Sequence, residues 1–110
     1  DFSETSQQAV KTAAEMASQF EAELHVLHSV PYLAEPLYRG IPLPPDEQGN
    51  WQTQVNASSR RTLNESLHKL GLTSSIEADH VHLAQGPANL AILSTIQELG
   101  IDLLVMGTAA

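Results

Sequence analysis

Residues that could bind a ligand stand at both ends of the chain. It opens with Asp1-Phe2-Ser3, which is typical of the turn between a buried strand and a helix. It closes with an apolar run over residues 101–106 and the small-residue turn Gly107-Thr108-Ala109-Ala110. In an open parallel α/β sheet, ligands bind outside the carboxyl ends of the strands. We therefore expect both segments to contribute to a binding site, and we expect the polypeptide to continue beyond both ends.

The five histidines are a second source of chemistry. His80 and His82 stand two residues apart, so on a strand they would share one face and could chelate a metal ion. No third ligand stands beside them in the sequence. His25 and His28 have a spacing that separates them across a strand, and His68 falls on a predicted helix. Solvated or hydrogen-bonded histidines, and no metal site, are therefore the prediction.

The chain carries none of the common catalytic motifs. It has no Gly-x-Ser-x-Gly elbow, no Walker A sequence and no His-Glu-x-x-His. It also has no cysteine, which excludes disulfides and thiolate chemistry. Ser29, Ser58 and Ser59 have no identifiable base beside them. These observations predict a protein without a dedicated enzymatic reaction.

The composition indicates one globular domain. The chain has 110 residues, of which 42% are hydrophobic, enough for a core. Its formal net charge of -8 argues against nucleic acid and anionic membranes as partners. A small anionic ligand stays open, because backbone N–H groups at a helix N-terminus can hold phosphate. No apolar run approaches the length of a membrane span, so a cytoplasmic location is expected.

Helices and strands are predicted to alternate along the chain. Apolar periodicity predicts helices over 4–21, over 51–70 and from Gly86-Pro87 to Leu99, and strands over 24–30, 76–84 and 101–106. Residues 31–50 are rich in proline and glycine and are predicted to form a long loop without regular structure. This alternation predicts an α/β fold with a parallel sheet and right-handed crossovers.

The chain resembles the universal stress protein family over its whole length, and four segments carry the resemblance. They are Asp1-Phe2-Ser3 with Ser6 and an alanine-rich helix, the run 22–30, Gly86-Pro87-Ala88 before an amphipathic helix, and the run 101–108. The resemblance implies a three-layer open parallel sheet of five strands in the order 3-2-1-4-5, with helices on both faces. On that mapping the three strands of this chain are the second, third and fourth. The first would precede Asp1, and the fifth would follow Ala110.

The resemblance also implies a position for an adenine nucleotide. Asp1 matches the acid that reaches the adenosine, Val30 the residue whose backbone contacts adenine, and Gly107 the first glycine of the phosphate loop, which Thr108 follows. Ala110 stands where the second glycine is expected, and its methyl group would crowd a phosphate. A purely structural role stays open for two of these residues. Asp1 could simply cap the following helix, and Gly107 could be only a turn residue.

The sequence therefore leaves three functions open. The first is a non-enzymatic stress-response domain that forms a homodimer or pairs with a second such domain in the same chain, and that binds ATP weakly or not at all. The second is an ATP-binding nucleotide switch with slow hydrolysis at most. The third is a binding module for a non-nucleotide ligand under the 31–50 loop. Its pocket would be lined by Tyr32, Leu33, Leu37 and Tyr38, while Trp51 is a further aromatic candidate for a partner surface.

Overall fold

The computed structural model describes residues 2–30, 37–38, 41–42 and 45–107. Its elements follow one another as α1 (Glu4–Phe20), β1 (Val26–Val30), β2 (Leu37–Tyr38), β3 (Ile41–Pro42), α2 (Pro45–Lys69), the 3₁₀ turn η1 (Ala78–His80), β4 (Val81–Gln85) and α3 (Ala88–Leu99). The alternation of helices with strands confirms the predicted α/β class.

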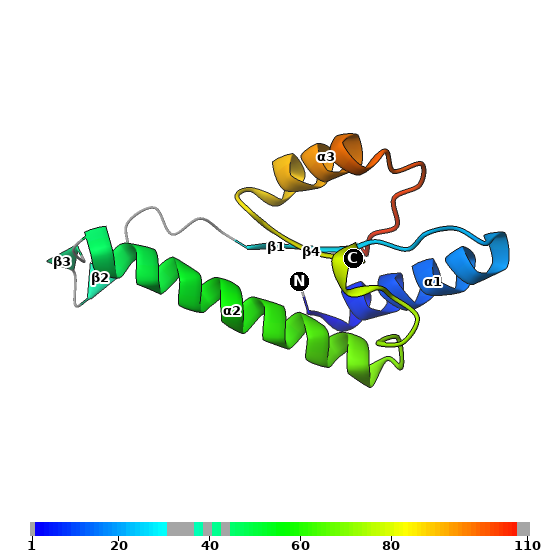
Figure 1. The fold of residues 1–110 in the computed structure, drawn as a ribbon, viewed down its shortest axis with the longest axis horizontal. Coiled ribbons are helices and arrows are strands. Elements are labelled where there is room, and N and C mark those ends of the chain that lie inside the picture. The colour runs from blue at the N-terminus through cyan, green and yellow to red at the C-terminus, as the bar shows by residue number, and fades with distance from the viewer. Residues whose placement is uncertain (1, 31–36, 39–40, 43–44, 108–110) are drawn as a thin grey trace.

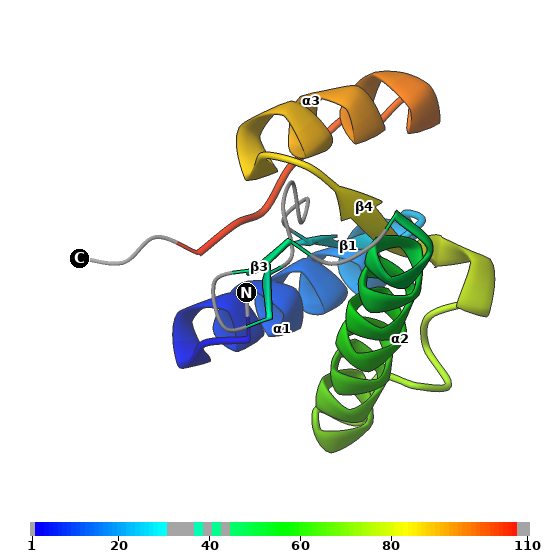
Figure 2. The same ribbon diagram turned by 90° about the vertical axis from the view of Figure 1, so that its left-hand side faces the viewer.

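The centre of the molecule is a parallel pair of strands covered by helices on both faces. β1 pairs with β4 in a register that places Val26 opposite Val81 and Val30 opposite Gln85. Figure 1 shows α3 above this pair and α1 and α2 below it, and Figure 2 shows the same layers from the side. The structure thus confirms a parallel sheet between two helical layers, with two strands in that sheet among the described residues.

Helix α1 begins and ends where its sequence predicts. Ser3 is the N-cap, and its hydroxyl oxygen accepts a hydrogen bond from the backbone N–H of Ser6 at 3.2 Å. The helix ends at Glu21, which has a left-handed backbone (φ 54°) and donates its N–H to the carbonyl of Ala17. After this turn the chain reverses direction and enters β1. Residues 21–25 are the connection between α1 and the beginning of that strand.

The core lies between β1, α2 and the segment that precedes β4. Val26, Leu63, Leu67 and Ile76 are buried and pack together. Partly buried apolar side chains surround them, namely Phe2, Val10, Leu24, Leu72 and Val81. Leu63 and Leu67 are four residues apart and share a face of α2, as the helical periodicity of 51–70 predicts.

The predicted loop over 31–50 is wrong in two places. β2 and β3 form a small antiparallel pair, in which Leu37 lies opposite Pro42 and Tyr38 opposite Ile41. Helix α2 begins at Pro45, six residues before the predicted start at 51. Proline is tolerated in the first turn of a helix, because the N–H that it lacks has no intrahelical partner there. Pro45 therefore begins a helix at a position where the proline content predicted a loop.

The predicted strand over 76–84 is corrected at its beginning. Residues 78–80 form the turn η1, in which the backbone N–H of His80 donates to the carbonyl of Glu77 at 2.9 Å. Pairing with β1 starts only at Val81 and continues to Gln85. Ile76 is buried in the core, so its apolar character reflects packing rather than strand periodicity.

The predicted strand over 101–106 is absent from the described structure. A strand needs a neighbour for its backbone hydrogen bonds, and these residues pair with neither β1 nor β4. Their side chains are also not covered on both faces, because Leu103, Leu104 and Met106 are 62%, 47% and 58% exposed. An apolar run predicts a buried strand only where a neighbouring strand lies beside it.

Candidate functional site

An apolar groove runs along the edge of β1 that does not face β4. Residues of α1, β1, α3 and the 101–106 segment line it, among them Val10, Ala13, Leu27, Ile92, Ile96 and Val105. In the part of the chain that the structure describes, no strand pairs with this edge of β1. The groove therefore presents backbone hydrogen-bonding groups and apolar side chains together.

Val30 occupies the carboxyl end of β1, as the sequence predicts. Val30 is only 1% exposed, so its side chain belongs to the core. Its carbonyl oxygen accepts a hydrogen bond from the backbone N–H of Gly86, at 2.9 Å. One backbone group of the residue predicted to contact adenine is therefore already engaged within the fold.

Gly107 lies against the first turn of α1. A Cβ atom at this position would stand 2.7 Å from both Cγ2 and the backbone oxygen of Thr5, which is closer than real Cβ atoms approach. The absence of a side chain thus permits the close approach of the two segments. The other predicted nucleotide residues, Asp1 and Thr108, lie outside the described residues, as does Ala110.

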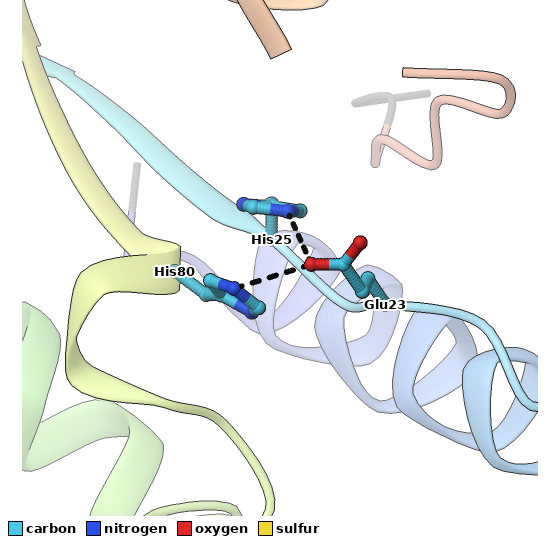
Figure 3. A group of neighbouring side chains, drawn as sticks. All are labelled: Glu23, His25 and His80. Atoms are coloured by element: carbon cyan, nitrogen blue, oxygen red, sulfur yellow. Dashed lines mark ion pairs between the residues drawn. The ribbon is translucent and has the colours of Figure 1, made fainter. Parts of the chain in front are cut away.

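A cluster of histidines and acids lies at the opposite end of β1 from Val30, where α1 turns into the strand. The Nε2 atom of His80 is 3.3 Å from Oε1 of Glu23, and Nε2 of His25 is 3.7 Å from the same oxygen. The two imidazoles stack with their centroids 4.1 Å apart. Figure 3 shows both rings turned toward the Glu23 carboxylate. We call Glu23, His25 and His80 the histidine–glutamate cluster.

His82 extends this cluster along β4. Its Nε2 atom is 2.9 Å from Nδ1 of His25, within hydrogen-bond distance. Burial lowers the pKa of His82, and the basic groups of His25, His80 and Arg60 lower it further. A neutral His82 can accept a hydrogen bond from the Nδ1–H of His25, which fixes the orientation of the His25 ring.

The sequence reasoning missed Glu23 and His25 as neighbours of His80. No third ligand stands beside His80 and His82 in the sequence, because the partners of His80 come from the segment before β1. Glu23-x-His25 stands at the start of the predicted strand over 24–30, whereas His80-x-His82 lies inside the predicted strand over 76–84. The two motifs meet because pairing of the parallel strands begins with Val26 opposite Val81, which the predicted bounds did not indicate.

His28 lies apart from the cluster, as its spacing predicts. Its ring packs on Phe2 with a centroid distance of 4.3 Å. Burial is the main cause that lowers the pKa of His28 below its usual value of 6.5. The folded state therefore favours the neutral imidazole at this position.

We expect His28 to make folding sensitive to acid. Because its pKa is lower in the folded state than in the unfolded state, the unfolded chain binds more protons as the pH falls below about 6.5. The free energy of unfolding should then decrease, with a contribution from His28 of at most about 1.4 kcal/mol per pH unit. Urea titrations between pH 7.5 and 5 should show a shallower pH dependence for His28→Gln than for the parent. An equal pH dependence of the free energy of unfolding in the two proteins would contradict a lowered pKa of His28 in the folded state.

The predicted ligand pocket under the 31–50 loop stays a prediction. Tyr32 and Leu33 lie outside the described residues, and so do the side chains of Leu37 and Tyr38. Trp51 is described, and it is 47% exposed on α2. Within the described ranges, no helix is both long enough and apolar enough to cross a membrane.

Comparison with known proteins places the whole chain in one group. The family model described as "Universal stress protein family" matches residues 1–110. The curated protein "Universal stress protein A homolog 1" of Coxiella burnetii (strain RSA 493 / Nine Mile phase I) is 27% identical to the chain over 108 residues. That match covers 98% of this chain and 71% of the relative. Both comparisons agree with the resemblance carried by the four segments of the sequence.

Proposed function

The chain belongs to the universal stress protein family, and from that premise we propose that it acts in stress survival through association rather than through a chemical reaction. The proposed setting is the cytoplasm, and the proposed partner is a second copy or a second domain of the same kind in one chain. The exposed apolar side chains of α3 support a role in association, since Leu90 and Leu93 are 60% and 58% exposed. Apolar side chains gathered on a surface are typical of interaction sites.

The whole fold that we propose is the five-stranded sheet in the order 3-2-1-4-5. The apolar groove beside β1 supports it, because this order puts a strand between β1 and the 101–106 segment. A strand lying there would pair with the open edge of β1 and cover Leu27 and Val105. It would also give 101–106 the neighbour that a buried strand requires.

Weak or absent ATP binding is the nucleotide behaviour that we propose. The observation that carries this proposal is the close packing of Gly107 on Thr5. This contact explains why the position requires glycine even if no phosphate binds there. The hydrogen bond from Gly86 to the carbonyl of Val30 supports it at the other end of the predicted site. Ala110 adds a methyl group where the phosphate loop of nucleotide-binding members is expected to have glycine.

The alternative is an ATP-binding nucleotide switch. The contact of Gly107 with Thr5 favours this alternative in one respect. It places Gly107 against the first turn of α1, and the N-terminus of a helix attracts phosphate. Under this alternative, Asp1 would reach the adenosine and Thr108 would stand beside the phosphates. The two functions differ in whether Ala110 is tolerated at the phosphate position.

Nucleotide binding by the full-length protein tests the two alternatives. We expect no adenine nucleotide in the supernatant of the denatured protein, and an ATP dissociation constant weaker than about 1 mM by calorimetry. Ala110→Gly should strengthen ATP binding at least about tenfold, which is about 1.4 kcal/mol. Ala109→Gly is the matched control and should leave the affinity as in the parent. Micromolar ATP binding by the parent, weakened by Asp1→Ala, would instead establish the nucleotide switch.

A further inference from the structure

The histidine–glutamate cluster joins two parts of the chain that are far apart in sequence. Glu23 and His25 belong to the turn between α1 and β1, whereas His80 ends the turn η1 before β4. The parallel register of β1 and β4 brings the two turns together, because Val26 pairs with Val81. The position of the three side chains is therefore set by the sheet and not by one mobile loop.

The donor atoms of this cluster have the spacing of metal ligands. Zinc lies about 2.0–2.2 Å from nitrogen and oxygen ligands, so two ligands of a tetrahedral site are roughly 3.3–3.6 Å apart. Oε1 of Glu23 is 3.3 Å from Nε2 of His80 and 3.7 Å from Nε2 of His25. One donor atom from each of the three residues lies within 4.8 Å of the other two. An imidazole nitrogen binds a metal ion in the plane of its ring, so the stacked rings of His25 and His80, 4.1 Å apart, must turn toward a shared ion for both to bind it.

We propose that Glu23, His25 and His80 form a binding site for a divalent transition-metal ion, with zinc as the ion that best suits their donor set. Two imidazole nitrogens and one carboxylate oxygen are ligands that zinc uses in proteins. Magnesium and calcium prefer sites made of oxygen atoms alone. A fourth position is left for water or for Glu77, whose Oε2 atom is 3.6 Å from Nε2 of His80.

His82 has the position of an outer-shell residue in this site. Metal-binding histidines usually donate their second ring N–H to a nearby acceptor, which fixes the tautomer and the ring orientation. Nδ1 of His25 is 2.9 Å from Nε2 of His82, so the Nε2 atom of His25 is left to face the ion.

The cluster is open to an ion from solvent. The Glu23 side chain is 76% exposed, whereas those of His25 and His80 are 16% and 17% exposed. The two imidazoles are thus largely packed within the fold, and the Glu23 carboxylate lies beside the edges of both rings (Figure 3). The acidic side chains of Glu23, Glu77 and Asp79 give this surface a negative charge that attracts cations.

Zinc titration of the untagged full-length protein tests the site. After treatment with a chelator, the protein should bind one equivalent of zinc in competition with a chromophoric chelator, and zinc should raise its melting temperature. Cobalt should give the strong visible absorption of a four-coordinate site. His82→Gln should weaken zinc binding about 10–100-fold, as expected for an outer-shell residue. His25→Gln and His80→Gln remove ligands and should weaken it further.

His68→Gln is the matched control, because His68 is an exposed histidine on α2 outside the cluster. It should keep the zinc affinity of the parent. Circular dichroism in metal-free buffer separates a lost ligand from a lost fold, since all four variants should retain the parent spectrum. The proposal is overturned if the parent binds no zinc, or if His25→Gln and His80→Gln bind it as tightly as the parent does.

Discussion

Leu67→Ala should lower the free energy of unfolding by about 2–5 kcal/mol, the range for removing a large aliphatic side chain from a core. Leu67 is 5% exposed and packs with Val26, Leu63 and Ile76, which come from three different segments. Those neighbours belong to β1, α2 and the chain before β4, so they cannot all move inward to fill the space. Unfolding by urea, monitored by circular dichroism, should show the loss as a lower urea concentration at the midpoint of the transition.

Leu93→Ala provides the matched control for that measurement. It removes the same atoms from a helix, but the Leu93 side chain is 58% exposed on α3. Surface substitutions usually change stability by less than about 0.5 kcal/mol. At a protein concentration where both variants are monomeric, a similar loss for the two would mean that α2 does not anchor the core as the structure shows. A change of oligomeric state in Leu93→Ala alone would instead support association through α3.

Gly107→Ala is the second substitution with a large expected effect. The added methyl group would stand 2.7 Å from the backbone oxygen of Thr5, and a helix backbone cannot move aside as a side-chain tip can. Overpacking of this kind typically costs about 1–3 kcal/mol. Thermal and urea unfolding of the full-length protein should therefore show a clear loss of stability, whether or not nucleotide is present.

Gly100→Ala distinguishes this steric effect from the general cost of replacing glycine. Gly100 has a left-handed backbone (φ 65°) at the end of α3, and a Cβ there would meet nothing within 4 Å. Its replacement should cost about 1 kcal/mol through backbone strain alone. If Gly107→Ala leaves stability unchanged and alters only ATP binding, then the glycine serves a ligand and not the contact with α1.

Local signals in the sequence predicted much of the fold. Ser3 and Gly100 mark the boundaries of α1 and α3, because capping depends on residues within a few positions of the helix end. The start of α2 at Pro45 was missed, since proline is compatible with both a loop and the first turn of a helix. The strand predicted over 101–106 failed because strand formation depends on a distant neighbour, which periodicity does not reveal.

The candidate site was harder to predict than the fold. Val30 and Gly107 were identified through the family resemblance, and the structure shows what each contacts within the fold. The association of His25 with His80 depends on strand pairing across α2, so sequence spacing alone could not reveal it. The groups that lie beside His80 in space, Glu23 and His25, are more than 50 positions away from it in the sequence.

The pairing of β1 with β4 also has a consequence for how the chain folds. These strands are adjacent in space, yet all of α2 lies between them in the sequence. A contact between distant segments forms late unless the intervening chain is already ordered, because closing a long loop costs conformational entropy. Helix α2 shortens that loop when it forms, since it rises only about 1.5 Å per residue. The folding rate should therefore depend on early formation of α2 and its contact with β1 through Leu63 and Leu67.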